Sequence, residues 1–149
     1  MAYHHFPGTA DIKLDFRRCV FTAKGDNGRK IMSYQTGPDK NVHYATINTR
    51  FVNCRFDYEF GNEVDTGLLS LPFVSSRPSK DFLFSFRRCR FSLKGVHPII
   101  GDRDGNKSGC YEFRNCRIDS ESDPFRKVYN IPTSEIYISL NNAPMTRLQ

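Results

Sequence analysis

A six-residue pattern recurs four times along this chain, and it constrains the fold more than any other feature. The pattern is aromatic-x-x-Cys-x-apolar, and its copies lie at 16–21, 51–56, 86–91 and 113–118. The cysteines of successive copies are separated by 35, 35 and 27 residues. Such a recurrence indicates one structural unit repeated along the chain, each copy burying its apolar face against the next.

Apolar residues alternate with period two on both sides of each copy, and the phase of this alternation changes within the copy. In the first copy the apolar residues before the change have even numbers, namely Ile12, Leu14 and Phe16. Those after it, Cys19 and Phe21, have odd numbers. A one-residue change of phase leaves two consecutive residues on the outer side of a corner. Each copy is therefore predicted to be a strand, a tight bend and a second strand. The predicted core stack after the bends comprises Cys19, Cys54, Cys89, Cys116, Phe21, Phe56, Phe91 and Ile118.

The second residue of each corner must turn the chain sharply. Asn is the non-Gly residue best suited to a left-handed backbone, and it stands there as Asn53 and Asn115. Arg18 and Arg88 hold the same place in the other two copies. Short apolar segments between or after the copies, at 31–34, 68–71, 98–100 and 136–140, form a looser second series and are each predicted to be a short buried strand.

The composition favours an all-β fold in one domain. The chain has 13 Phe and 7 Tyr in 149 residues, aromatic residues favour strands, and no helical apolar pattern persists for three turns. We expect a single domain over 1–149, with 1–10 and 141–149 as terminal extensions or caps. The apolar runs are too short to insert into a membrane, and the chain lacks the pattern of a cleaved secretory signal. Five Cys is an odd number, so we expect reduced thiols that act as small apolar residues.

The predicted repeat resembles a rung of the right-handed parallel β-helix of the pectin-lyase-like superfamily. Such a rung has three short strands, a tight bend often marked by Asn, and inward stacks of Phe, Cys and Ile. The resemblance extends over about residues 11–140, and Phe-x-Asn-Cys-x-Phe, found at 51–56 and nearly at 113–118, is typical of such rungs. It implies a short right-handed parallel β-helix of about four to five rungs, although Arg18 and Arg88 depart from the Asn pattern. The alternative is an antiparallel β-sandwich, which gives no reason for the corner pattern to recur.

The outward position after each cysteine supplies the candidate binding residues. It holds Arg55, Arg90 and Arg117, whose guanidinium groups would align if the repeats stack in register. Such a column favours an anionic partner, which could be an acidic glycan, a phosphate backbone or an acidic protein surface. The alternative is a ladder that largely neutralises itself, because Asp57 and Asp119 follow two positions later on the same face.

Other candidate sites have weaker support in the sequence. The cysteines include no Cys-x-x-Cys pair, which argues against a metal site. Oxygen-bearing residues alternate in 101–109 as in a calcium loop, but the Gly falls too early and Phe113 stands where Glu is needed. The acids at 57, 59, 63, 65, 102 and 104 and the histidines at 43 and 97 show no catalytic spacing. We therefore predict no catalytic residue, no metal and no cofactor.

Three classes of function are compatible with these observations, and fold alone cannot choose among them. The preferred class is a non-enzymatic structural or receptor- or glycan-facing β-helix of a virus particle, similar to bacteriophage tail spikes, fibres and baseplate spikes. It would assemble in the host cytoplasm as a homo-oligomer, with a trimer favoured, or with other virion subunits over its open ends. An extracellular location is the alternative.

The second class is a carbohydrate-active enzyme of the same fold, either a polysaccharide lyase or a glycoside hydrolase. This length argues against it, because such enzymes usually need more rungs to build a long substrate groove. The third class is a nucleic-acid-binding module, suggested only by the formal charge of +6. Interleaved acids, and the lack of a basic cluster outside the repeats, argue against nucleic acid as a partner.

Overall fold

The computed structural model describes residues 10–25, 32–33, 44–60, 69–70, 82–95, 99, 108–125 and 135–147. Within these ranges the regular structure consists of strands, in three sheets of six, four and two strands. The prediction of an all-β chain is confirmed.

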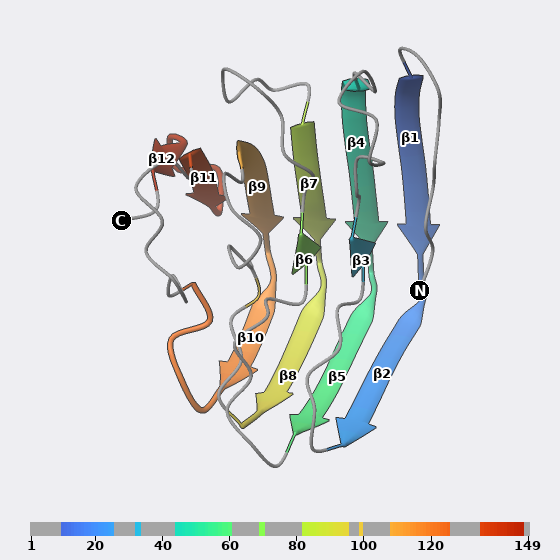
Figure 1. Ribbon diagram of the computed structural model, residues 1–149. Coiled ribbons are helices and arrows are strands. Elements are labelled where there is room, and N and C mark those ends of the chain that lie inside the picture. Colours follow the sequence, from blue (N-terminus) through green and yellow to red (C-terminus); the bar gives the residue numbers. More distant parts are fainter. Residues whose placement is uncertain are drawn as a thin grey trace.

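The largest sheet is built mainly from the strands that precede the corners (Figure 1). Its order is β1 (Ala10–Arg17), β4 (Tyr44–Val52), β7 (Phe82–Arg87), β9 (Ser108–Arg114), β11 (Glu135–Leu140) and β12 (Thr146–Arg147). The first five strands are all parallel to their neighbours, and β12 is antiparallel to β11. Each strand thus pairs with its counterpart one repeat away.

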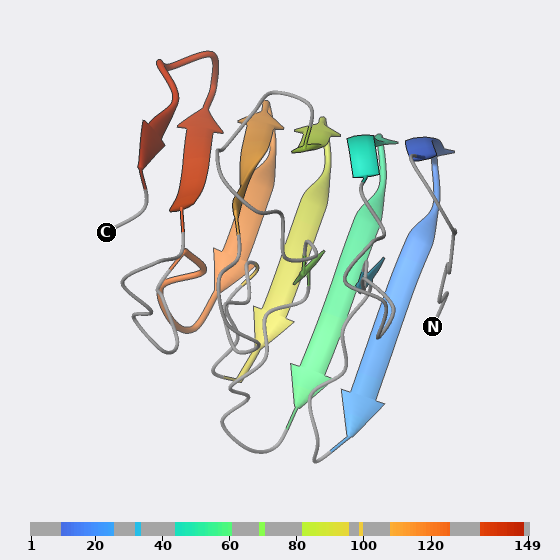
Figure 2. The ribbon, with the colours of Figure 1, turned by 45° about the horizontal axis from the view of Figure 1, so that its top comes forward.

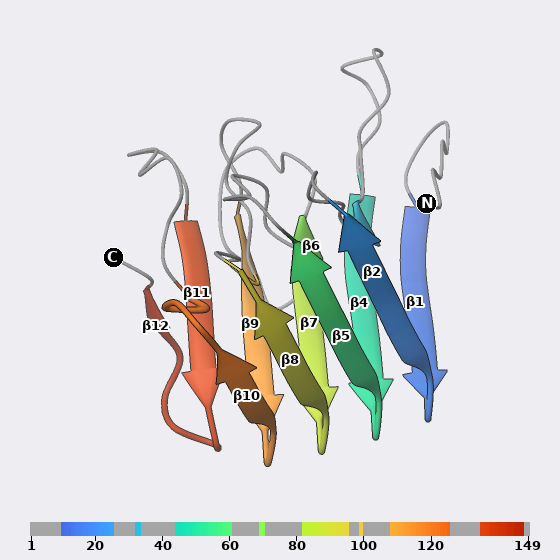
Figure 3. The same cartoon turned by 90° about the horizontal axis from the view of Figure 1, so that it is seen from below.

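The second sheet contains the strands that follow the corners. They are β2 (Val20–Gly25), β5 (Arg55–Phe60), β8 (Arg90–Lys94) and β10 (Arg117–Ser120), again all parallel. Seen from below, the two larger sheets form two layers that meet along the row of corners (Figure 3). A third sheet pairs β3 (Met32–Ser33) with β6 (Leu69–Ser70), also in parallel. Parallel pairing throughout the repeats excludes the antiparallel sandwich.

The core between the two layers consists of stacked identical rings. Phe51 lies beside Phe16 and Phe86 with ring centroids 5.1 and 4.9 Å apart, and Phe86 continues the column to Phe113 at 4.8 Å. Across the corner, Phe56 stacks between Phe21 and Phe91 at 5.0 and 4.5 Å. The two columns contact each other edge-to-face, an arrangement that adds to the stability gained by burial alone.

All four corners share one backbone conformation. Their second residues, Arg18, Asn53, Arg88 and Asn115, have φ values of 54–55°, in the left-handed region. Neighbouring corners are joined by hydrogen bonds of 2.9–3.0 Å, because the amides of residues 18, 53 and 88 donate to carbonyls of the following repeat. The predicted corner is confirmed, and arginine adopts it at two places where Asn is the more usual residue.

The four repeat cysteines form a column directly inside the corners. Cys54 and Cys89 are each 2% exposed, whereas Cys19 and Cys116 at the two ends are half-buried. The thiols of Cys54, Cys89 and Cys116 donate to the carbonyls of Phe16, Phe51 and Phe86 in the preceding repeat, at 3.4–3.5 Å. A small apolar side chain with one weak donor therefore suits this site, since it fills the corner and also satisfies a carbonyl. None of the five cysteines forms a disulfide.

The second series of short strands is only partly confirmed. Met32–Ser33 and Leu69–Ser70 are strands, as predicted, and they pair in parallel. Ile99 is instead a fully buried bend whose amide donates to the carbonyl of Pro124 at 2.8 Å. The placement of Ile136–Leu140 in this series is wrong. That segment is β11 of the largest sheet, where Leu140 pairs with Phe113. Its period-two pattern ends at a turn, and Asn141 has the same left-handed backbone as a corner, so the segment is a pre-corner strand.

The last repeat differs from the others after its first strand. A turn with positive φ at Asn141 and Asn142 reverses the chain into β12, which pairs with β11 and adds a further strand beside it (Figure 2). The hydroxyl of Ser139 holds this turn by donating to the carbonyl of Ala143 at 2.6 Å. Part of the predicted extension 141–149 is therefore an antiparallel edge of the sheet, whereas residues 1–9 and 148–149 lie outside the described part.

Candidate functional site

The three candidate arginines lie above one another on the outer face of the second sheet. Arg55 pairs in register with Arg90, and Arg90 with Arg117. All three side chains are exposed, because they alternate with the buried column of rings. Parallel strands are about 4.8 Å apart, so the column places like charges one strand spacing from each other. The fourth member of the row is Val20, which is 63% exposed.

Acidic residues interleave with this column. Arg55 forms an ion pair with Asp57 at 2.6 Å, and Arg117 forms one with Asp119 at 3.0 Å. Arg90 has no acid on its own strand and contacts Asp119 of the next strand at 3.5 Å. The self-neutralising ladder considered from the sequence is thus present for Arg55 and Arg117, while Arg90 shares an acid that lies closer to another arginine.

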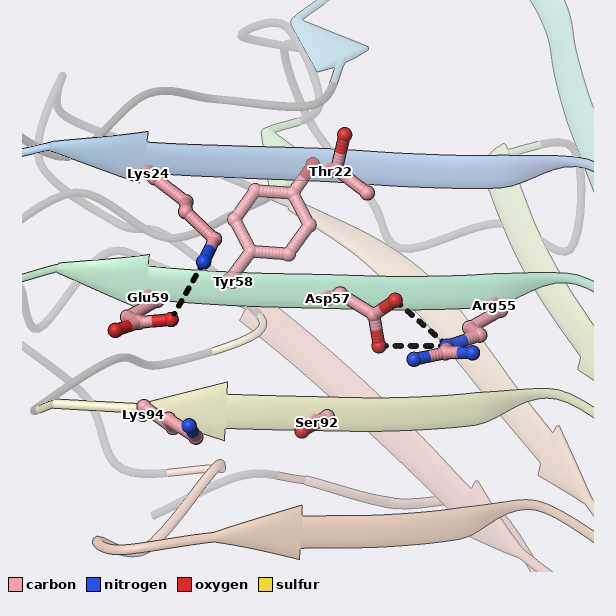
Figure 4. A pocket seen from close by; sticks show the side chains of 8 residues that line it. All are labelled: Thr22, Lys24, Arg55, Asp57, Tyr58, Glu59, Ser92 and Lys94. Atoms are coloured by element: carbon pink, nitrogen blue, oxygen red, sulfur yellow. Dashed lines mark hydrogen bonds and ion pairs between the residues drawn. The ribbon is translucent and has the colours of Figure 1, made fainter.

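A shallow depression of about 280 Å³ opens on the same face (Figure 4). Its lining comes from β2, β5 and β8 and consists of Thr22, Lys24, Arg55, Asp57, Tyr58, Glu59, Ser92 and Lys94. Figure 4 shows Glu59 paired with Lys24, at 3.1 Å, and Asp57 paired with Arg55. The hydrogen bond from Lys24 and its charge lower the pKa of Glu59. The carboxylate of Glu59 is therefore held in its ionised form.

A similar ion-pair cluster lies on the outer face of the first sheet. Asp15 accepts from Arg17 at 2.9 Å and from Arg50 at 2.6 Å, and these bonds lower the pKa of Asp15 to about 2. The same contact raises the pKa of Arg17. In the fourth repeat, Arg114 lies 3.4 Å from Glu112. The first, second and fourth repeats therefore all carry arginines that are partnered by acids.

The third repeat contributes no acid of its own to such pairs, and of its arginines only Arg90 pairs with a described acid, Asp119 of the next repeat. Ser85 occupies the register position of Asp15 and Glu112, and Ser92 that of Asp57 and Asp119. Arg87 and Arg88 are exposed and form no ion pair with any described residue. Sequence reasoning treated these two only as corner residues. A repeat-by-repeat comparison of 15–22, 50–57, 85–92 and 112–119 would have found them, because only 85–92 contains no acid.

The remaining candidates are placed only in part. Glu63, Asp65, Asp102 and Asp104 lie outside the described residues, as do both candidate histidines. Within the described ranges no three His, Cys, Asp or Glu side chains gather as metal ligands. The hydrogen bond with Cys116 and burial both raise the pKa of Cys89, which disfavours its thiolate. Among the described residues, no helix is long and apolar enough to cross a membrane.

No known family model matches this chain, and neither the curated proteins nor the solved structures include a match.

Proposed function

We propose that the chain is a right-handed parallel β-helix of four to five rungs, of the pectin-lyase-like kind. Two features support this: every strand of the repeats pairs in parallel with its counterpart one repeat on, and the corners stack in register. Crossover connections between parallel strands of one sheet are nearly always right-handed, which favours this hand. An experimental trace of the connections from β2 to β4 and from β5 to β7 tests it, and a left-handed or hairpin path would contradict it.

We propose that this β-helix is a non-enzymatic part of a virus particle, which supports the particle or presents its arginine face to an acidic glycan. The observation that carries the proposal is the exposed column of Arg55, Arg90 and Arg117 on a rigid parallel sheet. Aligned guanidinium groups match carboxylate and sulfate oxygens through paired hydrogen bonds. The free thiols are in keeping with assembly in a reducing cytoplasm.

The state of the described carboxylates supports binding over cleavage. Glycosidases need a carboxylic acid whose pKa is raised, so that it can protonate the leaving group. Here Asp15 and Glu59 have lowered pKa values, and Asp57, Glu112 and Asp119 contact arginines at 2.6–3.5 Å. Nearby cations favour the ionised form of a carboxyl group, so Asp15 and Glu59 suit ion pairing better than proton donation.

Partial exposure at one end of the column supports a further subunit there. Phe16 and Phe21 in the first repeat are half-buried, whereas their central counterparts Phe51, Phe56 and Phe86 are fully buried. Edge strands such as β1 and β2 also carry backbone groups suited to pairing with another chain. A homo-oligomer, with a trimer favoured, or another virion subunit at these edges would complete the burial.

Two measurements test the proposed function. Sedimentation equilibrium should give a mass of about three times the 17.2 kDa chain, and a stable monomer would contradict a self-assembling part. Incubation with polygalacturonate should show binding without new reducing ends or unsaturated products. Chain cleavage would instead favour a polysaccharide lyase or a glycoside hydrolase.

A further inference from the structure

The corner of the third repeat carries more positive charge than its three counterparts. Residues 85–92 read Ser-Phe-Arg-Arg-Cys-Arg-Phe-Ser, with three arginines and no acid. The windows in register with it, 15–22, 50–57 and 112–119, each contain at least one Asp or Glu. We call Arg87, Arg88 and Arg90 the third-repeat cluster. Arg87 ends β7, Arg88 is the corner residue and Arg90 begins β8, so the three charges lie within four residues around one corner.

The acids of the described residues leave this cluster largely uncompensated. Arg87 and Arg88 have no ion pair with the described residues, and Arg90 reaches Asp119 only at 3.5 Å. Asp119 is bound more closely by Arg117, at 3.0 Å. Adjacent guanidinium groups repel one another, and an added anion relieves this repulsion.

The backbone beneath the cluster is held on both sides. The amide of Asn53 donates to the carbonyl of Arg87, and the amide of Arg88 donates to that of Arg114, both at 2.9 Å. Arg90 begins β8, which is paired with β5 and β10. Binding would therefore order only the arginine side chains, which reduces the entropic cost of holding a ligand.

We propose that Arg87, Arg88 and Arg90, with the half-buried hydroxyl side chains of Ser85 and Ser92 beside them, form a binding site for an anionic group of an acidic polysaccharide. This inference rests on the proposed glycan-facing function, and it assigns glycan binding to one repeat of the arginine column. Carboxylate and sulfate both offer the planar or clustered oxygens that guanidinium groups bind in pairs. The serines leave room at two positions where the other repeats hold mostly acids, the exceptions being Arg50 at the first position and Thr22 at the second.

The described surface favours a polysaccharide over nucleic acid. Proteins that bind single strands stack bases on exposed aromatic rings. The Phe and Tyr side chains whose burial the structure describes are all buried or half-buried, and most of them belong to the core or pack against it. The interleaved acids of the neighbouring repeats also oppose a long phosphate backbone more than a single anionic group.

Isothermal titration of the full chain with polygalacturonate, dextran sulfate and neutral dextran tests the site. The double variant Arg87→Val, Arg88→Asn copies the second-repeat corner Val52-Asn53, so the left-handed position receives a residue that already occupies it elsewhere. We expect this variant to bind the preferred polyanion about ten- to a hundredfold more weakly. The matched control is Arg17→Val, Arg18→Asn. It removes the same charge from the first corner, where Asp15 binds Arg17, and should change the affinity by less than about threefold.

Ser85→Asp sharpens the test without removing an arginine. It places an acid where Asp15 stands, two residues before Arg87, and it should weaken binding by about tenfold while the circular dichroism stays unchanged. Carboxylate selectivity would show as binding to polygalacturonate, and sulfate selectivity as binding to dextran sulfate. A stronger response to a short DNA duplex than to either polyanion would overturn the polysaccharide assignment.

The outcomes separate this inference from the proposed function. If the wild-type chain binds neither polyanion, both the glycan-facing function and the site are contradicted. If it binds but the third-corner and first-corner variants lose affinity equally, the glycan-facing function stands and the third-repeat site is wrong.

Discussion

The inner and outer faces of the second sheet are built from the same strands in the same register, yet repetition has opposite consequences on them. On the inner face, Phe21, Phe56 and Phe91 stack at 4.5–5.0 Å, and each ring gains contact from its copy. On the outer face, Arg55, Arg90 and Arg117 align in the same way, and each charge repels its copy.

The difference explains why the inner residues repeat more strictly than the outer ones. A buried aromatic residue is stabilised by an identical neighbour, so the same residue suits every repeat. An exposed arginine instead needs an acid close by, and Asp57 and Asp119 supply one in two repeats. The third repeat retains its arginines with only the shared contact of Arg90 to Asp119, and this difference is the basis of the anion site proposed there.

The largest expected effect comes from placing a charge on the inner face. Cys54→Asp should lower the free energy of unfolding by about 4 kcal/mol or more, because it buries a carboxylate at a position that is 2% exposed. Cys54→Ala is the control and should cost only about 1 kcal/mol, from lost packing and one weak hydrogen bond. Urea unfolding measures both. Equal stabilities for the two variants would show that the column is not a dry core.

The next effect concerns the corner, which decides the residues that face inward. Asn53→Val should cost about 1–2 kcal/mol, since a β-branched residue is strained at a φ of 54°. Asn53→Gly should remain within a few tenths of a kcal/mol of the wild type, because Gly adopts this conformation freely. Thermal unfolding of the pair distinguishes backbone strain from loss of the Asn side chain. An equal loss in both would assign the effect to the side chain.

A smaller effect is expected from the acid partners on the outer faces. The pKa of Asp15 is about 2 in the folded chain, below its ordinary value of 3.8, so the unfolded chain binds more protons between these values. The stability that Asp15 contributes is therefore fully present above about pH 4 and is lost as the pH falls toward 2. Urea unfolding of the wild type and Asp15→Asn across this range should show their difference shrinking at low pH. A difference that stays constant would contradict the ion-pair assignment.

The smallest effect should come from the outer column itself. Arg55→Ala should change the free energy of unfolding by less than about 0.5 kcal/mol, because its ion pair with Asp57 is exposed to solvent. Unfolding at low and high salt measures this. A loss as large as that of Cys54→Ala would show that the arginine ladder is structural and not available for a ligand.

Local patterns predicted much of the fold because they act within a few residues. The change of phase at Phe16 and Cys19 places the first on one strand and the second on the next, as the structure has it. The segment Ile136–Leu140 was misplaced, because a short apolar run does not reveal which sheet receives it. Only the pairing of Leu140 with Phe113 decides that.

The candidate site was found in part for a similar reason. Spacing alone identified Arg55, Arg90 and Arg117 and the acids that follow two of them. One copy of the repeat does not show that Arg87 and Arg88 have no ion pair with a described residue. The reason is that an acid can pair with an arginine of the neighbouring strand, as Asp119 does with Arg90. It becomes visible only when the four copies are aligned in register.

The amino-acid sequence by itself determined the strand-corner-strand unit, its inward Phe and Cys residues and its outward arginines, because alternation and left-handed corners are properties of neighbouring residues. The tertiary structure confirmed the parallel pairing that the repeats and their resemblance predicted, and it alone decided that β12 turns back beside β11 and which arginines share an acid. These depend on contacts between residues far apart along the chain, whose distances no local pattern encodes.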